Sequence, residues 1–165
     1  MNGFLRGAAS DIKRRMVEDI LALARSIAAD VIAGDYTRLN APPFAGYTLA
    51  TSPNGSTVIA LKLTPDACAR LPEDQRNLDF FVLGPNSQLG RHYHERASAH
   101  VHFIAGRGIA EVDRVETKAG PGTALIFPAR SVHNVRSDDE TVLFASFQDN
   151  PILQPDGSVD YFAVA

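Results

Sequence analysis

After residue 43 the chain breaks into short apolar runs separated by turn residues, and this pattern limits the possible folds more than any other feature. The runs cover residues 47–52, 57–63, 78–83, 100–105, 109–115, 123–127, 141–147 and 158–164. Glycine, proline and asparagine separate them, as in Pro53-Asn54-Gly55-Ser56 and Gly106-Arg107-Gly108. Short strands with such punctuation are typical of an all-β sandwich or barrel. We therefore predict an all-β fold with a barrel over about residues 45–164.

One α-helix is predicted before the strands, over residues 10–33. An apolar residue recurs there every three or four positions, which places one apolar stripe along the helix: Ile12, Met16, Ile20, Leu23, Ile27 and Val31. Ser10 suits the N-cap, and Gly34 suits the C-terminal stop. We expect the stripe to pack on a sheet or against a partner subunit. A short helical turn is also expected at residues 67–71.

Length and composition are those of one ordinary globular domain, which we expect to span residues 1–165. The net charge of −3, without a basic block, argues against binding to nucleic acid or to an anionic membrane. Cys68 is the single cysteine, so no disulfide can form within the chain. Residues 1–15 lack the apolar run of a signal peptide. We therefore expect a cytoplasmic protein whose partner is a small molecule.

All five histidines lie between residues 92 and 133, and this clustering indicates metal chemistry. His92 and His94 are separated by one residue, so in a strand both imidazoles point to the same face. A third ligand must come from another strand, and His133 is the candidate. Imidazole is a common ligand of zinc, iron, nickel and copper. Three histidines would leave coordination positions free for water, substrate or dioxygen.

Two segments resemble the paired motifs of the cupin superfamily. The first cupin motif is His-x-His, then a glutamate, then a glycine; the second is Gly-x5-Pro-x-Gly-x2-His-x3-Asn. This chain has His92 and His94 before Gly106, and Gly122 and Pro128 before His133, with the spacing of the second motif. The resemblance covers about residues 78–147. It implies a double-stranded β-helix, or jelly-roll barrel, that holds one divalent transition metal.

The chain departs from the first motif at the glutamate. Ser98 or Ala99 stands at that position, and neither side chain is a good metal ligand. His100 could take the place of the glutamate if the strand bulges inward. His102 shares a strand face with His100, so both point into the barrel or both point outward. Both histidines point outward if Ala99, Val101 and Phe103 face the interior of the barrel.

The second motif also departs from the family pattern, because Arg130 replaces its glycine and Ser137 its asparagine. Arg130 lies close to His133 and is a candidate for binding a substrate carboxylate, which guanidinium binds through two hydrogen bonds. No aspartate or glutamate occupies a motif position where it could act as a catalytic base.

Without a motif glutamate the site resembles the three-histidine cupins, such as the thiol and β-diketone dioxygenases. The resemblance implies a metal-dependent enzyme, first of all an iron dioxygenase, with zinc, nickel or manganese as alternatives to iron. A metal-dependent isomerase or lyase is a second possibility, and a barrel that binds a small ligand without turnover is a third. Cupins commonly form dimers, so a homodimer is expected.

Overall fold

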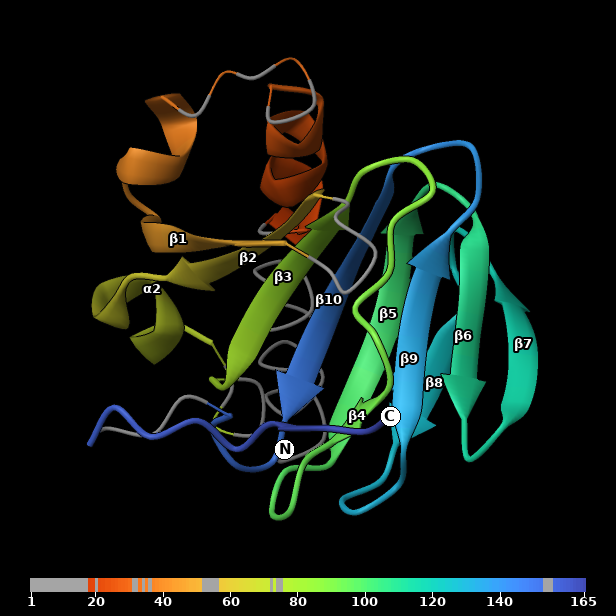
Figure 1. Ribbon diagram of the computed structural model, residues 1–165. Helices are drawn as coiled ribbons and strands as arrows, with labels where there is room; N and C mark the ends of the chain where they lie inside the picture. Colours follow the sequence, from red (N-terminus) through yellow and green to blue (C-terminus); the bar gives the residue numbers. More distant parts are fainter. Residues whose placement is uncertain are drawn as a thin grey trace, which may run out of the picture.

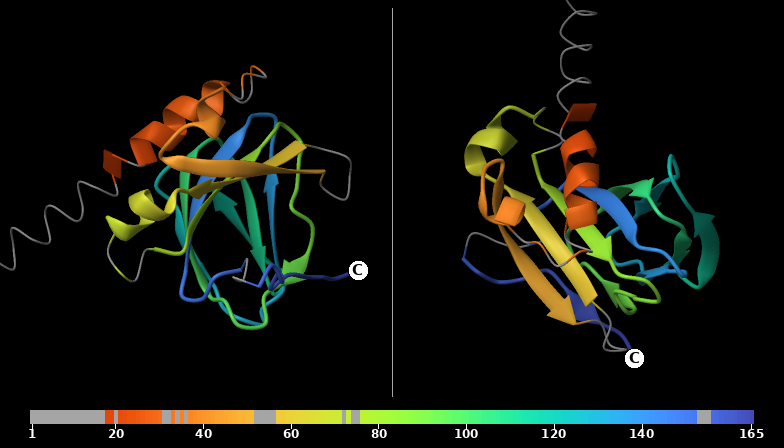
Figure 2. Two further views of the ribbon diagram at one scale, coloured as in Figure 1. Left: turned by 90° about the vertical axis from the view of Figure 1, so that its left-hand side faces the viewer. Right: turned by 90° about the horizontal axis from the view of Figure 1, so that it is seen from above.

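The computed structural model describes residues 18–19, 21–30, 33, 35, 37–51, 57–71, 73, 76–152 and 156–165, which form two antiparallel sheets (Figure 1). The six-stranded sheet contains, in spatial order, β1 (Phe44–Thr51), β2 (Thr57–Leu63), β3 (Leu78–Leu83), β10 (Val142–Gln148), β5 (Ala99–Ala105) and β8 (Ala124–Phe127). The five-stranded sheet contains β11 (Phe162–Ala163), β4 (His92–Tyr93), β9 (His133–Ser137), β6 (Gly108–Val112) and β7 (Val115–Ala119). The sheets surround one interior (Figure 2). The predicted jelly-roll barrel with an N-terminal helix is confirmed.

Strand alternation divides the buried apolar side chains into an inner and an outer cluster. In β10, Val142 and Phe144 belong to the inner cluster between the sheets, whereas Leu143, Ala145 and Phe147 belong to the outer one. Every residue of β10 is buried, because both faces of the six-stranded sheet are covered at this strand. The inner face of the six-stranded sheet faces the other sheet.

The described part of the N-terminal helix, residues 18–19 and 21–30, covers the outer face of the six-stranded sheet (Figure 2). Ala24, Ile27 and Ala28 are buried there in the outer cluster. Of the two expected positions for this helix, packing on the sheet is therefore observed for these residues. The expected cap at Ser10, the stop at Gly34 and the rest of residues 10–17 lie outside the described residues.

Two shorter helical segments precede β3. A 3-10 helix, η1 (Thr37–Asn40), leads into β1, and α2 (Pro65–Ala69) begins after Thr64, whose hydroxyl accepts a hydrogen bond from the Ala67 amide at 3.3 Å. The helix α2 confirms the turn expected near residues 67–71. Among the described residues, no helix is long and apolar enough to cross a membrane.

Two turns of the barrel depend on unusual backbone conformations. Gly106, between β5 and β6, has a φ of +75°, and a Cβ there would lie 1.9 Å from the carbonyl oxygen of Thr141. Only glycine fits this turn. Asp113 and Arg114 also have positive φ and form the tight turn between β6 and β7. The prediction of one strand over residues 109–115 was therefore wrong: the chain reverses after Val112 and continues as a second strand.

Candidate functional site

Two strands of the five-stranded sheet bring His92, His94 and His133 together. His92 lies in β4 directly opposite His133 in β9, and His94 follows β4 by one residue. All three residues are buried. Each offers one ring nitrogen, and these three atoms lie within 4.8 Å of one another. The group found among the described residues holds three histidines and no carboxylate.

The backbone fixes the tautomer of each of these imidazoles. Nδ1 of His92 lies 2.8 Å from the Gly90 carbonyl oxygen, and Nδ1 of His133 lies 3.0 Å from that of Ser131. Nδ1 of His94 is hydrogen-bonded to the carbonyl oxygen of Asp160. A carbonyl only accepts, so each Nδ1 must carry the proton, which leaves the lone pair of each neutral ring on Nε2. Backbone groups that hold metal-binding histidines in this way are typical of metal sites.

Burial also keeps these histidines neutral. It lowers the pKa of His92 to about 3, with a further contribution from the neighbouring charge of protonated His133. Burial lowers the pKa of His133 to about 4 and also lowers that of His94. A proton and a divalent cation compete for the same nitrogen lone pairs. At neutral pH the three imidazoles are therefore unprotonated at Nε2 and can bind a cation there. The three nitrogen donors fit a divalent transition metal.

The metal-free protein should lose stability as the pH falls from about 6.5 to about 4. In the unfolded chain the histidines take up protons near pH 6.5, whereas in the fold His133 does so only near 4, so acid favours unfolding. For His133 alone the difference corresponds to roughly 3 kcal/mol. Urea unfolding at several pH values measures it. A His133→Phe variant should lose less stability over this range, and equal losses in both proteins would contradict the assignment.

The C-terminal strand β11 pairs with β4 and brings two further residues to the histidines. The carboxylate of Asp160, just before β11, accepts hydrogen bonds from the backbone amides of Glu95, Arg96 and Ala97 at 2.7, 2.9 and 3.1 Å. The ring of Tyr161 stacks on that of His92, with centroids 4.4 Å apart. Sequence reasoning missed both residues, because Asp160 follows His94 by 66 positions and no local pattern links them.

Two other predicted residues do not join the cluster. His100 and His102 are exposed on the outer face of β5, whereas Ala99, Val101 and Phe103 are buried in the inner cluster. This is the outward arrangement of the two alternatives, and it places His100 away from the three-histidine group. Its cause is the alternation of the strand, which holds without an inward bulge at His100.

Arg130 lies at the rim of the site rather than inside it. Its side chain is 74% exposed and forms an ion pair with Glu95, with 3.0 Å between Nη2 and Oε1. Its backbone amide donates to the carbonyl oxygen of His94 at 2.7 Å. Arg130 therefore connects the two histidine segments, and its role in binding a substrate carboxylate stays a prediction.

A polar patch on the inner face of the six-stranded sheet was not predicted as a unit. It consists of Lys62 in β2, Asp79 in β3, and Ser146 and Gln148 in β10. The sequence pattern does not indicate which way Ser146 and Gln148 point. Asp79 had no signal, because it stands within an apolar run. The electrostatic influence of Asp79 reaches the cluster, where it acts to raise the pKa of His94 against the larger effect of burial.

Residues 79–146 match the family model Cupin_2, described as a cupin domain. No curated protein matches the sequence. Among solved structures, the chain is similar to a cupin-2 domain of Rhodospirillum rubrum, with 18% identity and a TM-score of 0.57 over 76% of this chain and 78% of that one. It is also similar to a predicted oxalate decarboxylase of Thermotoga maritima, with 15% identity and a TM-score of 0.52 over 62% of this chain and 90% of that one.

A third similar structure is the capsular polysaccharide assembling protein CapF of Staphylococcus aureus, with 12% identity and a TM-score of 0.52. The match covers 72% of this chain but only 34% of CapF. At identities this low, the likeness to all three structures shows the fold alone.

Proposed function

Because this chain belongs to the cupin superfamily, we propose that it is a metal-dependent enzyme that holds one divalent transition metal on His92, His94 and His133 and acts on a small molecule. One observation carries the proposal. The three Nδ1 atoms are hydrogen-bonded to backbone carbonyl oxygens, which leaves the three Nε2 lone pairs for a metal, and one ring nitrogen of each histidine lies within 4.8 Å of the other two.

We propose a dioxygenase reaction first, with iron as the metal. Three neutral imidazoles without a carboxylate add no negative charge to the site, as in the three-histidine cupins that the motifs resemble. Bound iron would supply the redox chemistry that dioxygen activation requires. The protein would contribute aromatic neighbours: Phe127 lies against His133 with ring centroids 4.7 Å apart, and Tyr161, which is 42% exposed, stacks on one face of His92.

An isomerase or lyase reaction is the second candidate, and one observation supports it. Proton transfer needs a base, and the sequence motifs supply none. Asp79 is a buried carboxylate on the inner face, on the side where the histidines lie. Lys62 and Gln148 hold its two oxygens, so Asp79 would exchange one of these partners for the substrate when it accepts a proton. The proposal for this reaction rests on Asp79, whereas the dioxygenase proposal does not need it.

The test is to purify the protein without added metal, determine its metal content by elemental analysis, and measure oxygen uptake with small thiols, diketones and phenols. Close to one equivalent of iron and substrate-dependent oxygen uptake are expected. Zinc or nickel without uptake would favour the isomerase or lyase instead. No metal, even after incubation with each ion, would contradict the metal centre and leave a barrel that binds small ligands. His100→Ala is the matched control, since its exposed imidazole should not affect metal content.

We also propose that the protein is a cytoplasmic homodimer. The single cysteine, Cys68, suits a reducing compartment. Ile126 is a large apolar residue exposed on the edge strand β8, where a second copy could cover it. Sedimentation of the purified protein tests the dimer.

A further inference from the structure

Polar side chains interrupt the apolar inner face of the six-stranded sheet where β2, β3 and β10 lie side by side. Asp79 is only 6% exposed and Gln148 only 3%. Along their strands, Leu78 and Phe80 of the outer apolar cluster flank Asp79, and Phe147 of the same cluster precedes Gln148. An unpaired polar group in such a position destabilises a fold by roughly 1–3 kcal/mol. These buried polar residues therefore need hydrogen-bonding partners. Their presence on an otherwise apolar face points to a role in binding.

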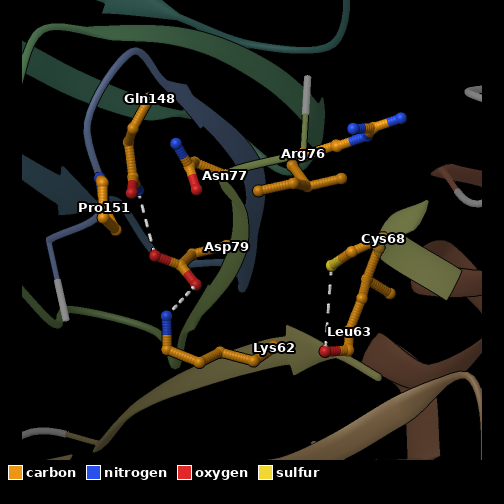
Figure 3. Close-up of a pocket in the computed structure, with 9 residues that line it drawn as sticks. Lys62, Leu63, Cys68, Arg76, Asn77, Asp79, Gln148 and Pro151 are labelled. Atoms are coloured by element: carbon orange, nitrogen blue, oxygen red, sulfur yellow. Dashed lines mark hydrogen bonds and ion pairs between the residues drawn. The ribbon is translucent and has the colours of Figure 1, made fainter. Parts of the chain in front are cut away.

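The partners form a network around the Asp79 carboxylate (Figure 3). Lys62 Nζ lies 2.6 Å from Oδ1, and Gln148 Nε2 donates to Oδ2 at 3.0 Å. Gln148 Nε2 also lies 3.2 Å from the hydroxyl oxygen of Ser146. The two carboxylate oxygens are thus both engaged, and the carboxylate holds the Lys62 ammonium in one place. An ammonium has three N–H donors. Among the described residues Asp79 takes one of them, and the Lys62 side chain remains 45% exposed.

A pocket of about 160 Å³ opens beside this ammonium. A cavity of similar size in another protein holds benzene, so a small molecule fits. Lys62, Arg76, Asn77, Asp79 and Gln148 supply the polar part of its wall. Among the described lining residues, Lys62 and Arg76 are cationic and Asp79 is anionic. The guanidinium of Arg76 points away from Lys62 in Figure 3, which leaves Lys62 as the cation in direct reach.

We propose that this pocket binds the carboxylate of a small organic acid, with Lys62 as the contact residue and with Asp79 and Gln148 as its positioning residues. Charge-assisted hydrogen bonds to a carboxylate are strong, and the amide of Asn77 can add a neutral one. None of the described residues that line this pocket is one of the three histidines, so the anion site is independent of the proposed metal centre.

The experiment titrates metal-free protein with acetate, malonate and succinate at constant ionic strength and follows backbone amide resonances by NMR. We expect saturable shifts around Lys62, and a Kd at least about tenfold weaker in Lys62→Met. Lys62→Arg keeps the charge and should retain most of the binding. Lys118→Met removes an exposed lysine of β7 and is the matched control, with an unchanged Kd expected. Neutral succinamide should not compete.

Equal affinity in Lys62→Met and the starting protein would overturn the proposal, and so would equal binding of succinamide and succinate. The absence of saturable shifts with all three acids at millimolar concentrations would overturn it as well. Lys62→Met removes the ion-pair partner of Asp79 and leaves a buried charge, so the double variant Lys62→Met/Asp79→Asn provides a folded comparison that should also fail to bind. Because no metal is present, a negative result leaves the metal centre standing, and a His133→Ala protein without metal should still bind the acid.

Discussion

His133→Ala is expected to abolish metal retention while the barrel stays folded. The variant removes one of three nitrogen ligands, and loss of even an indirect partner of a metal ligand lowers affinity by about 10–100-fold. Loss of the ligand itself should therefore weaken binding by at least roughly 100-fold. The β-sheet should persist, because the backbone pairing of His133 with β4 and β6 is kept, and the variant removes from the inner apolar cluster only the contact of the ring with Phe127.

Metal content after dialysis and titration with Co²⁺, whose absorption reports coordination, measure this effect, and far-UV circular dichroism reports the fold. His92→Ala should behave in the same way. His102→Ala is the matched control: its imidazole lies on the outer face of β5 against the edge of Phe147, so Co²⁺ binding should not change. Full metal occupancy in His133→Ala would remove His133 from the proposed ligand set.

The barrel and the three-histidine group could be predicted because their signals are local. Turn residues separate the strands in the sequence, and the spacing of His92 and His94 directs both rings to one face. The tight turn between β6 and β7 escaped detection for a physical reason. Such turns need positive φ, which asparagine and glycine adopt readily, but here Asp113 and Arg114 adopt it. Because neither turn residue is asparagine or glycine, the sequence pattern predicted one strand where the structure has β6 and β7.

The polar lining of the barrel could not be predicted. The direction of a side chain in a strand can be inferred from the sequence only when one face of that strand is polar. β10 is buried on both faces, so its residues give no alternation from which to infer that Ser146 and Gln148 point inward. Asp79 lies in the same situation in β3, within an almost fully buried run. In β5, by contrast, exposed His100 and His102 alternate with buried residues, and the outward arrangement is the one that this alternation predicts.

Asp160→Ala is expected to weaken metal binding by about 10–100-fold, although Asp160 is not itself a ligand of the proposed metal. Its carboxylate accepts three successive backbone amides, from Glu95 to Ala97, directly after His94. Its carbonyl oxygen accepts the Nδ1 proton of His94. Burial acts to raise the pKa of Asp160, but the three amide donors outweigh it and hold the pKa below its ordinary value. The carboxylate is therefore charged at neutral pH and fixes the carbonyl in place.

When the Asp160 side chain is lost, the carbonyl remains but is no longer held, so His94 should lose its fixed tautomer and orientation. Asp160→Asn keeps one acceptor oxygen and should be intermediate, a gradation that general destabilisation would not produce. Asp156→Ala is the matched control, because that exposed carboxylate bonds only to nearby Ser158 among the described residues. Co²⁺ affinity and the Co²⁺ absorption spectrum are the measurements. An Asp160→Ala protein with unchanged affinity and spectrum would show that β4 alone positions His94, and that β11 only covers the site.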